Sequence, residues 1–226
     1  MKKTNKGYSR NGYNLIAPVY DLLASLALGR GYIKSKWALL ENINSGDTVW
    51  FIGGGTGANL PEILKRCGSN GKVIYTEASE IMLQKARKNL SPEIIHQVKF
   101  ICLGDFKLPS DVKVDVIITQ FFLDVLTDTS INSLFEQVGK RASTAARWIF
   151  LDFYPVINKK IFIRLMIGFF NLLTGHPRKE LPEYDLFFQK WGWREIKTTS
   201  FKDGFYMAKL YKAPPKAIRL ATTSLK

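Results

Sequence analysis

The sequence predicts an α/β fold in which a mostly parallel sheet is covered by helices on both faces. Short apolar segments alternate with amphipathic segments of helical period along most of the chain. Several of the short segments are apolar at nearly every position, which is typical of strands buried on both faces of a parallel sheet. Near the C-terminus, Asp203-Gly204 joins two strand-like runs and favours a β-hairpin, so the last strand should be antiparallel.

The order of the elements follows from these patterns and from the turn residues between them. Seven strands are expected, at Asp47–Ile52, Val73–Thr76, Val98–Cys102, Val114–Thr119, Trp148–Phe153, Arg194–Phe201 and Phe205–Lys212. The helices between them are expected at Asn59–Cys67, Ser79–Leu90, Ser130–Ala142 and Tyr184–Trp191, with Ser79 capping the second one.

The two ends of the chain differ from this central region. Apolar residues recur at helical spacing over Tyr13–Asn42, with breaks at Gly29 and Gly31. We therefore expect residues 1–45 to form a helical N-terminal extension, or lid, of one domain whose main part is residues 46–212. Residues 213–226, which include Pro214-Pro215 and scattered basic side chains, should form a loose tail.

Composition excludes several classes of protein. Of the 226 residues, 46% are hydrophobic and 23% are charged, which argues against a disordered or fibrous chain. The net charge of +14 predicts attraction to an anionic partner, such as nucleic acid, a membrane surface or an acidic substrate. The two cysteines lack a partner motif, so we expect no disulfide framework and a reducing, cytoplasmic location. We expect no signal peptide, because no uninterrupted apolar region with a small-residue cleavage site follows the basic first ten residues. We expect no membrane span, because the most apolar stretch, Ile161–Leu173, is too short.

A glycine-rich turn is the strongest functional signal. Gly53, Gly55 and Gly57 lie between an expected buried strand and an expected helix, where a backbone without Cβ atoms can approach a ligand closely. Such a turn can also be a tight connection that binds nothing. Glu77 ends the next strand, twenty positions after Gly57, where a carboxylate can accept both hydroxyl groups of a ribose. Together these features favour a ligand of the nucleoside type.

The identity of that nucleoside is less constrained by the loop itself. A phosphate-binding P-loop is excluded, because no Lys followed by Ser or Thr ends the turn. The pattern Gly53-x-Gly55-x-x-Ala58 does fit the nicotinamide-dinucleotide fingerprint. The acidic loop Gly104–Pro109 and the closing hairpin argue against that interpretation, since a dinucleotide fold usually has six parallel strands.

Four motifs in order resemble the class I S-adenosylmethionine-dependent methyltransferases, and within them the type 11, ubiquinone-biosynthesis-like group. The motifs are Val49–Gly57, Tyr75–Leu83, Gly104-Asp105 with Leu108-Pro109, and Asp115–Gln120. The resemblance covers about Val49 to Phe153, and the closing hairpin is also in the expected place. It implies a Rossmann-like, doubly wound seven-stranded sheet and methyl transfer from S-adenosylmethionine, with S-adenosylhomocysteine as product.

The resemblance also implies which residues bind the cofactor. The glycines would hold the methionine part, Glu77 the ribose and Asp105 the adenine amine, with the end of the fourth strand beside the methionine part. The expected binding residues are Gly53, Gly54, Gly55, Gly57, Glu77, Ala78, Met82, Gly104, Asp105, Phe106 and Gln120. One position departs from the family: Phe51 stands where an acidic residue usually helps to hold the methionyl amino group.

Methyl transfer is an in-line displacement, so alignment of the reactants is the main catalytic device and a base is needed only for some acceptors. Asp152 and Tyr154 close the fifth expected strand, and His176 follows the apolar segment, so these three are the candidate catalytic residues. Each also has an ordinary structural interpretation, as a loop hydrogen-bonding group or a helix-end residue. No paired metal ligands stand out, and we expect no metal.

The expected acceptor is a small, apolar or amphipathic molecule. Ile161–Leu173 is apolar on almost every face, which favours a helix buried against the sheet over an interfacial helix. A nucleic-acid partner is not expected, because no recognition module is present, whereas weak peripheral contact with an anionic membrane is compatible with the charge. Two alternatives stay open at this point: an NAD(P)-dependent oxidoreductase and a non-catalytic cofactor-binding scaffold.

Overall fold

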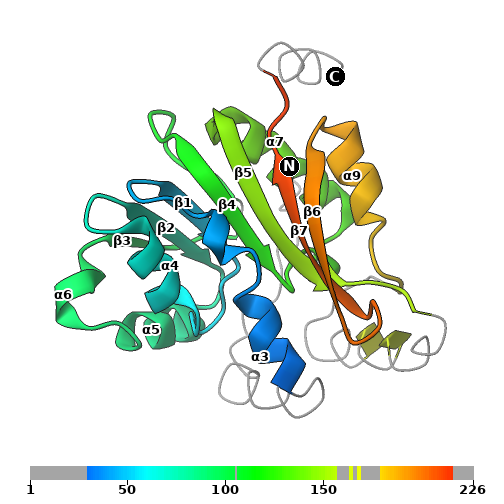
Figure 1. The fold of residues 1–226 in the computed structure, drawn as a ribbon, viewed down its shortest axis with the longest axis horizontal. Coiled ribbons are helices and arrows are strands. Elements are labelled where there is room, and N and C mark those ends of the chain that lie inside the picture. The colour runs from blue at the N-terminus through cyan, green and yellow to red at the C-terminus, as the bar shows by residue number, and fades with distance from the viewer. Residues whose placement is uncertain (1–29, 105, 157–162, 165–166, 169–178, 216–226) are drawn as a thin grey trace, which may run out of the picture.

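A single mixed sheet forms the centre of the computed structural model, which describes residues 30–104, 106–156, 163–164, 167–168 and 179–215. The strands are β1 (Thr48–Ile52), β2 (Lys72–Glu77), β3 (Val98–Cys102), β4 (Val114–Gln120), β5 (Ala142–Phe153), β6 (Arg194–Phe201) and β7 (Tyr206–Lys212). Their spatial order is β3-β2-β1-β4-β5-β7-β6 (Figure 1). Only the β5–β7 and β6–β7 pairs are antiparallel among these strands. The predicted Rossmann-like sheet with an antiparallel C-terminal strand is confirmed.

Helices connect β1 to β2, β2 to β3 and β4 to β5. The described helices are α3 (Arg30–Lys36), α4 (Leu60–Cys67), α5 (Glu80–Lys88), α6 (Pro92–Ile95), α7 (Asp128–Arg141), α9 (Tyr184–Lys190) and the 3-10 helices η1 (Leu40–Asn42) and η2 (Leu123–Val125). Ser79 caps α5 as predicted, because its side chain accepts from the Met82 N–H. None of the helices in the described ranges is long and apolar enough to cross a membrane.

Three local expectations differ from the structure. Helix α7 begins at Asp128, two residues earlier than predicted, because the Thr127 side chain accepts from the Ser130 N–H and caps it. Strand β5 begins at Ala142, directly after α7, with no turn residue to mark the change. Helix α3 continues through Gly31, where a break was predicted. The rest of the predicted N-terminal helical region lies outside the described residues.

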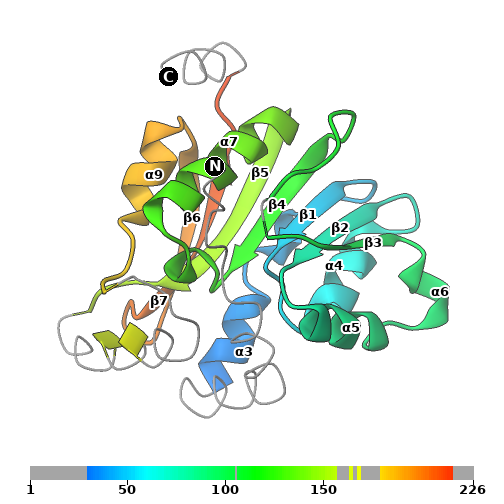
Figure 2. The same cartoon turned by 180° about the vertical axis from the view of Figure 1, so that it is seen from behind.

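Two apolar clusters, one on each face of the sheet, form the core. Alternate residues of β1 show the separation, since Phe51 belongs to the first cluster and Trp50 to the second. Helices α3, α4 and α5 cover the first face, and α7 and α9 cover the second, as Figure 2 shows from behind. Ile163 and Ile167, the two apolar residues of the Ile161–Leu173 segment that the structure describes, are buried in the first cluster.

The second face is covered differently beside β1 and β2. The described residues of the connection from β3 to β4 form no helix there. Instead, Phe106 and Leu108 are buried in the second cluster together with Trp50, Ile52 and Ile74. This loop therefore lies close to the carboxyl ends of the central strands, which is where ligands bind in open α/β sheets.

Candidate functional site

The glycine-rich turn has the backbone conformation that the sequence predicts. Gly53, Gly55 and Gly57 have φ angles of 63°, 62° and 71°, a region that favours glycine. The turn leaves β1 with the Gly53 N–H donating to the Thr76 carbonyl oxygen at 2.8 Å. Among the described residues other than its chain neighbours, an added Cβ at Gly55 would have only the Met82 Sδ, 4.0 Å away, as a neighbour. The turn therefore presents open backbone at the carboxyl end of β1.

Glu77 lies beside this turn, at the end of β2. Its Oε2 accepts from the Gly55 N–H at 3.0 Å, and its Oε1 accepts from the Ser79 N–H at 2.9 Å. The side chain is 7% exposed. Burial raises the pKa of Glu77, and the N–H donors of Ser79, Gly55 and Ala78 partly offset this effect. A buried carboxylate thus adjoins the open glycine turn, as the spacing of the motifs predicts.

Two further side chains hold the turn, and the sequence analysis did not single them out. The Tyr75 hydroxyl donates to the Gly55 carbonyl oxygen at 2.9 Å. The Asn89 Nδ2, at the end of α5, donates to the Thr56 carbonyl oxygen at 2.9 Å. Tyr75 precedes Glu77 by two residues and therefore faces the same side of β2. That period is the only signal in the sequence that could have pointed to it.

Phe51 is a core residue. Its side chain is 1% exposed and belongs to the first apolar cluster. Its ring meets the Tyr75 ring edge-on, with centroids 5.2 Å apart and an interplanar angle of 76°. The position that carries an acidic residue in the resembled family is therefore filled here by an aromatic pair beneath the turn.

The loop after β3 brings further predicted residues to the same edge of the sheet. Gly104 is exposed, and apart from its chain neighbours no atom of the described residues lies within 4 Å of where its Cβ would be. Phe106 is buried, has a φ of 58° and contacts the Phe122 ring edge-on at 5.9 Å. Asp105, the residue predicted to bind adenine, lies outside the described residues. A left-handed φ at a bulky residue such as Phe106 is uncommon and often marks a functional loop.

Phe122 covers the start of the turn. A Cβ on Gly53 would lie 2.1 Å from the Phe122 ring, so this glycine allows the ring to lie directly against the backbone. The preceding residue, Phe121, has a φ of 50°, and its side chain lies on the first face of the sheet. There it packs against Tyr32, Phe153 and Tyr206. Phe122 packs against the second cluster instead. Its partly exposed side chain places an aromatic ring directly against the start of the turn.

The remaining predicted binding residues also have identifiable contacts. Gln120 donates from Nε2 to the Lys36 carbonyl oxygen at 2.8 Å and accepts from the Asn59 Nδ2 at 2.9 Å. It thereby joins the end of β4 to α3 and to the start of α4. Met82 is buried beneath Gly55, and the Ala78 carbonyl oxygen accepts from the Cys102 thiol at 3.6 Å.

The candidate catalytic residues are not gathered at one point. Asp152 has no exposed surface, and its carboxylate accepts from the N–H groups of Phe122, Leu123, Asp124 and Phe153. Burial and the nearby Asp124 carboxylate raise its pKa. Tyr154 donates to Asp185 at 3.2 Å and lies beneath the Lys209 ammonium group. His176 lies outside the described residues.

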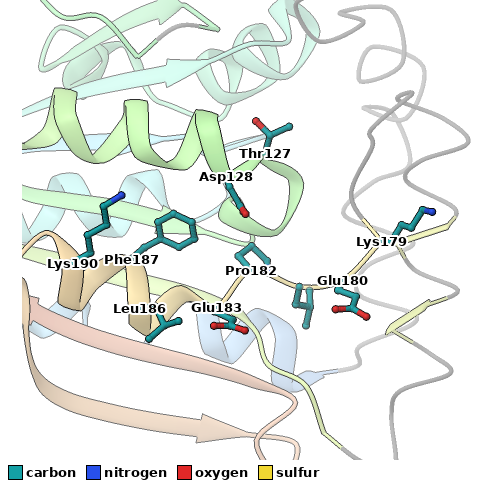
Figure 3. A pocket seen from close by; sticks show the side chains of 10 residues that line it. Thr127, Asp128, Lys179, Glu180, Pro182, Glu183, Leu186, Phe187 and Lys190 are labelled. Atoms are coloured by element: carbon teal, nitrogen blue, oxygen red, sulfur yellow. The ribbon is translucent and has the colours of Figure 1, made fainter. Parts of the chain in front are cut away.

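One hollow of the described residues is separate from the glycine turn. It has a volume of about 760 Å³ and lies between the start of α7 and the segment that leads into α9 (Figure 3). Its lining residues are Thr127, Asp128, Lys179, Glu180, Leu181, Pro182, Glu183, Leu186, Phe187 and Lys190. None of the predicted cofactor residues lines it, so its size does not make it the cofactor site.

The described side chains give no support to metal-ion chemistry or to a reactive cysteine at position 67. Among them, no group of three or more His, Cys, Asp and Glu residues is placed to hold a metal ion. Cys67 and Cys102 are free thiols, and burial raises the pKa of Cys67 to about 12. At neutral pH this thiol is protonated and a weak nucleophile.

Comparisons with known proteins point to one family. Residues 49–142 match a family model described as a methyltransferase domain. The ubiquinone/menaquinone biosynthesis C-methyltransferase UbiE of Paraburkholderia xenovorans (strain LB400) is 26% identical over 179 residues, which cover 76% of this chain and 72% of the relative.

Solved structures share the fold. A SAM-dependent methyltransferase from Aquifex aeolicus superposes with a TM-score of 0.60 and 19% identity, over 87% of this chain and 97% of its own. A second structure is the 1,6-didemethyltoxoflavin-N1-methyltransferase of Burkholderia thailandensis with bound 1,6-didemethyltoxoflavin and S-adenosylhomocysteine. It superposes with a TM-score of 0.65 and 11% identity, over 91% of this chain and 88% of its own. These findings favour methyl transfer over nicotinamide chemistry and over a non-catalytic scaffold. The domain match, the UbiE relative and the shared fold together support a class I S-adenosylmethionine-dependent methyltransferase.

Proposed function

We propose that this enzyme transfers a methyl group to a small, apolar or amphipathic acceptor, with the cofactor held by the glycine turn and Glu77. The turn and the carboxylate fit the cofactor physically. Gly55 offers open backbone where a side chain would obstruct a ligand. Glu77 brings a buried, acceptor-only group to within hydrogen-bonding distance of the same residue. The contact between Gly55 and Glu77 is the single observation that carries the proposal.

The roles of individual residues follow the resemblance. Gly53, Gly54, Gly55 and Gly57 would hold the methionine part, Glu77 the ribose hydroxyls, and Asp105 the adenine amine. Ala78, Met82, Gly104, Phe106 and Gln120 would line the cofactor. When bound, S-adenosylmethionine supplies a methyl group on a positively charged sulfur, which keeps the bonding electron pair when an acceptor nucleophile displaces it. The protein's task is then to align the acceptor and exclude water.

An aromatic surface supports an apolar acceptor. The partly exposed Phe122 ring lies against Gly53 and packs on the buried Phe106 ring, so a flat or apolar molecule could contact Phe122 there. The UbiE relative is named as a ubiquinone/menaquinone biosynthesis C-methyltransferase. This name and the aromatic edge point to the same class of acceptor.

We further propose that neither Asp152 nor Tyr154 removes a proton from the acceptor. Asp152 is enclosed, and its oxygens hold the backbone of the segment that carries Phe122. Tyr154 is engaged with Asp185, and burial raises its pKa further above the ordinary value of 10.0. Alignment of the reactants is therefore the proposed catalytic device, and Asp152 is a positioning residue.

Replacing Glu77 tests the cofactor site. We expect Glu77→Gln to weaken S-adenosylhomocysteine binding by about 1–3 kcal/mol, because an amide replaces the carboxylate acceptor. Isothermal titration calorimetry measures the change. Glu62→Gln is a matched control, since Glu62 pairs with Arg66 within α4 and lies outside the proposed site. Equal affinity in the Glu77→Gln and wild-type proteins would remove Glu77 from the site.

A labelled-methyl assay tests the acceptor class. Transfer of radioactive methyl groups from S-adenosylmethionine should occur to apolar phenols, quinols or amphipathic heterocycles. RNA, DNA and basic peptides serve as the alternative acceptors. Methylation of a nucleic acid or peptide, with none of any small molecule, would contradict the proposal.

A further inference from the structure

Both sides of Gly55 are held by side chains of one strand. The Glu77 carboxylate accepts from the Gly55 N–H, and the Tyr75 hydroxyl donates to the Gly55 carbonyl oxygen. The two peptide groups that flank Gly55 are therefore both attached to β2. Gly55 has a φ of 62°, and among the described residues beyond its chain neighbours only the Met82 Sδ lies within 4 Å of where its Cβ would be, so these two hydrogen bonds set the direction of its backbone.

The Tyr75 ring also shapes the turn by contact. The residue has no exposed surface, and its ring packs between Phe51 and Phe100. A Cβ on Gly54 would lie 2.5 Å from three of the ring and hydroxyl atoms, so the Gly54 backbone lies directly on Tyr75. A Cβ on Gly57 would approach the same hydroxyl at 3.4 Å. Three of the glycines thus adjoin one tyrosine.

Phe51 has no polar side-chain group that could hydrogen-bond to the glycine turn. Its ring is enclosed against Tyr75 at the end of β1, so the polar support of the turn from below comes from the tyrosine hydroxyl. A preformed turn binds more tightly, because the ligand does not have to order it.

We propose that Tyr75 is a positioning residue for the cofactor, whose hydroxyl fixes the glycine turn in the conformation that receives the methionine part. This inference rests on the proposed function, in which the turn holds that part and Glu77 holds the ribose. It goes further by naming a residue that touches the turn but not the cofactor, and by predicting which part of the ligand senses its loss.

The test compares two ligands on the Tyr75→Phe variant, which keeps the buried ring and removes only the hydroxyl. S-adenosylhomocysteine carries the amino-acid part, whereas 5′-methylthioadenosine has the same nucleoside and a thioether without it. We expect calorimetry to show roughly 3- to 10-fold weaker binding of S-adenosylhomocysteine, as loss of one hydrogen bond predicts. Binding of 5′-methylthioadenosine should change less than about 2-fold.

Hydrogen exchange of the ligand-free variant gives a readout that does not depend on binding. The amides of residues 54–57 should exchange faster in Tyr75→Phe, while those in the middle of β2 keep their protection. Tyr211→Phe is the matched control, because it also removes a hydroxyl hydrogen bond, to Asp185 at 3.0 Å on the other face of the sheet. It should leave both the exchange of the turn and the affinity for S-adenosylhomocysteine unchanged.

A second variant approaches the same contact from the other side. Gly54→Ala must displace the Tyr75 ring and should reproduce the selective loss of S-adenosylhomocysteine binding. Equal loss for both ligands, or no loss in Tyr75→Phe, would overturn the inference. If the wild-type protein did not bind S-adenosylhomocysteine at all, the proposed function would fail first, so the two failures are distinguishable.

Discussion

Glu77 is the residue whose ionisation matters most for the proposed site. Burial raises its pKa above the ordinary value of 4.5. In the ligand-free protein, a raised carboxyl pKa means that the contribution of this group to the free energy of unfolding is full at low pH. That contribution is lost as the pH rises through the raised pKa. The ionised form, however, is the one that can accept from two ribose hydroxyls.

Cofactor affinity should therefore depend on pH through this group. We expect the association constant for S-adenosylhomocysteine to increase as the pH rises through the raised pKa of Glu77, above the ordinary value of 4.5, because the carboxylate that accepts from the ribose forms there. Calorimetry at a series of pH values measures the dependence. In Glu77→Gln the slope should disappear, and a slope that persists in this variant would assign the titration to another group.

The burial of Phe51 leads to a prediction about the stability of the protein. Phe51→Asp would restore the acidic residue typical of the family but would place a carboxylate against the Tyr75 ring at a position that is 1% exposed. We expect it to lower the free energy of unfolding by roughly 3 kcal/mol or more. Ile196→Asp, on a side chain that is 52% exposed in β6, is the control and should change stability little. Urea denaturation distinguishes them, and equal stabilities would mean that position 51 is not enclosed.

The bounds of the helices and strands show which local sequence patterns are sufficient to predict an element. Strands β1 to β4 were predictable within about a residue, because apolar runs end at glycines or polar turns. The cap of α5 followed from Ser79 alone. The start of β5 was missed, since α7 passes into it at Ala142 without a glycine or proline. The hairpin turn spans Lys202–Phe205 and has three left-handed residues, Lys202, Asp203 and Gly204, so it is longer than the Asp-Gly pair suggested.

The cap of α7 gives a prediction at the scale of an element. Thr127 accepts from the Ser130 N–H at 3.1 Å and is part of the hollow beside α9, away from the glycine turn. Thr127→Ala should lower the free energy of unfolding by about 1 kcal/mol, the usual effect of losing such a cap. Affinity for S-adenosylhomocysteine should stay the same. A variant that folded as stably as the wild type would show that α7 does not depend on this cap.

At the scale of the whole molecule, the sequence indicated the fold and the region of the site but not the contacts within the site. The glycine turn and Glu77 could be placed together because strands of a parallel sheet end at one edge. The link between Gln120 and the Lys36 carbonyl, and the one between Tyr75 and Gly55, join residues 84 and 20 positions apart. Such contacts depend on side-chain packing that no local pattern encodes.

The net charge of +14 gives a prediction for the whole chain. We expect weak binding to vesicles that contain anionic lipid, and we expect it to fall steeply between about 0.05 and 0.5 M salt because screening shortens the range of the attraction. Co-sedimentation measures it, and vesicles of neutral lipid are the control. Binding that is as strong to neutral vesicles, or insensitive to salt, would point to insertion of apolar side chains instead.

The central claim is that the turn between β1 and α4 holds S-adenosylmethionine, despite the aromatic residue at position 51. Calorimetric titration of the wild-type protein with S-adenosylhomocysteine, with NADH and NADPH titrated in parallel, tests it most directly. The account predicts saturable binding of S-adenosylhomocysteine at one site per chain and no binding of either nicotinamide. Saturable binding of a nicotinamide, or no heat with S-adenosylhomocysteine, would contradict it.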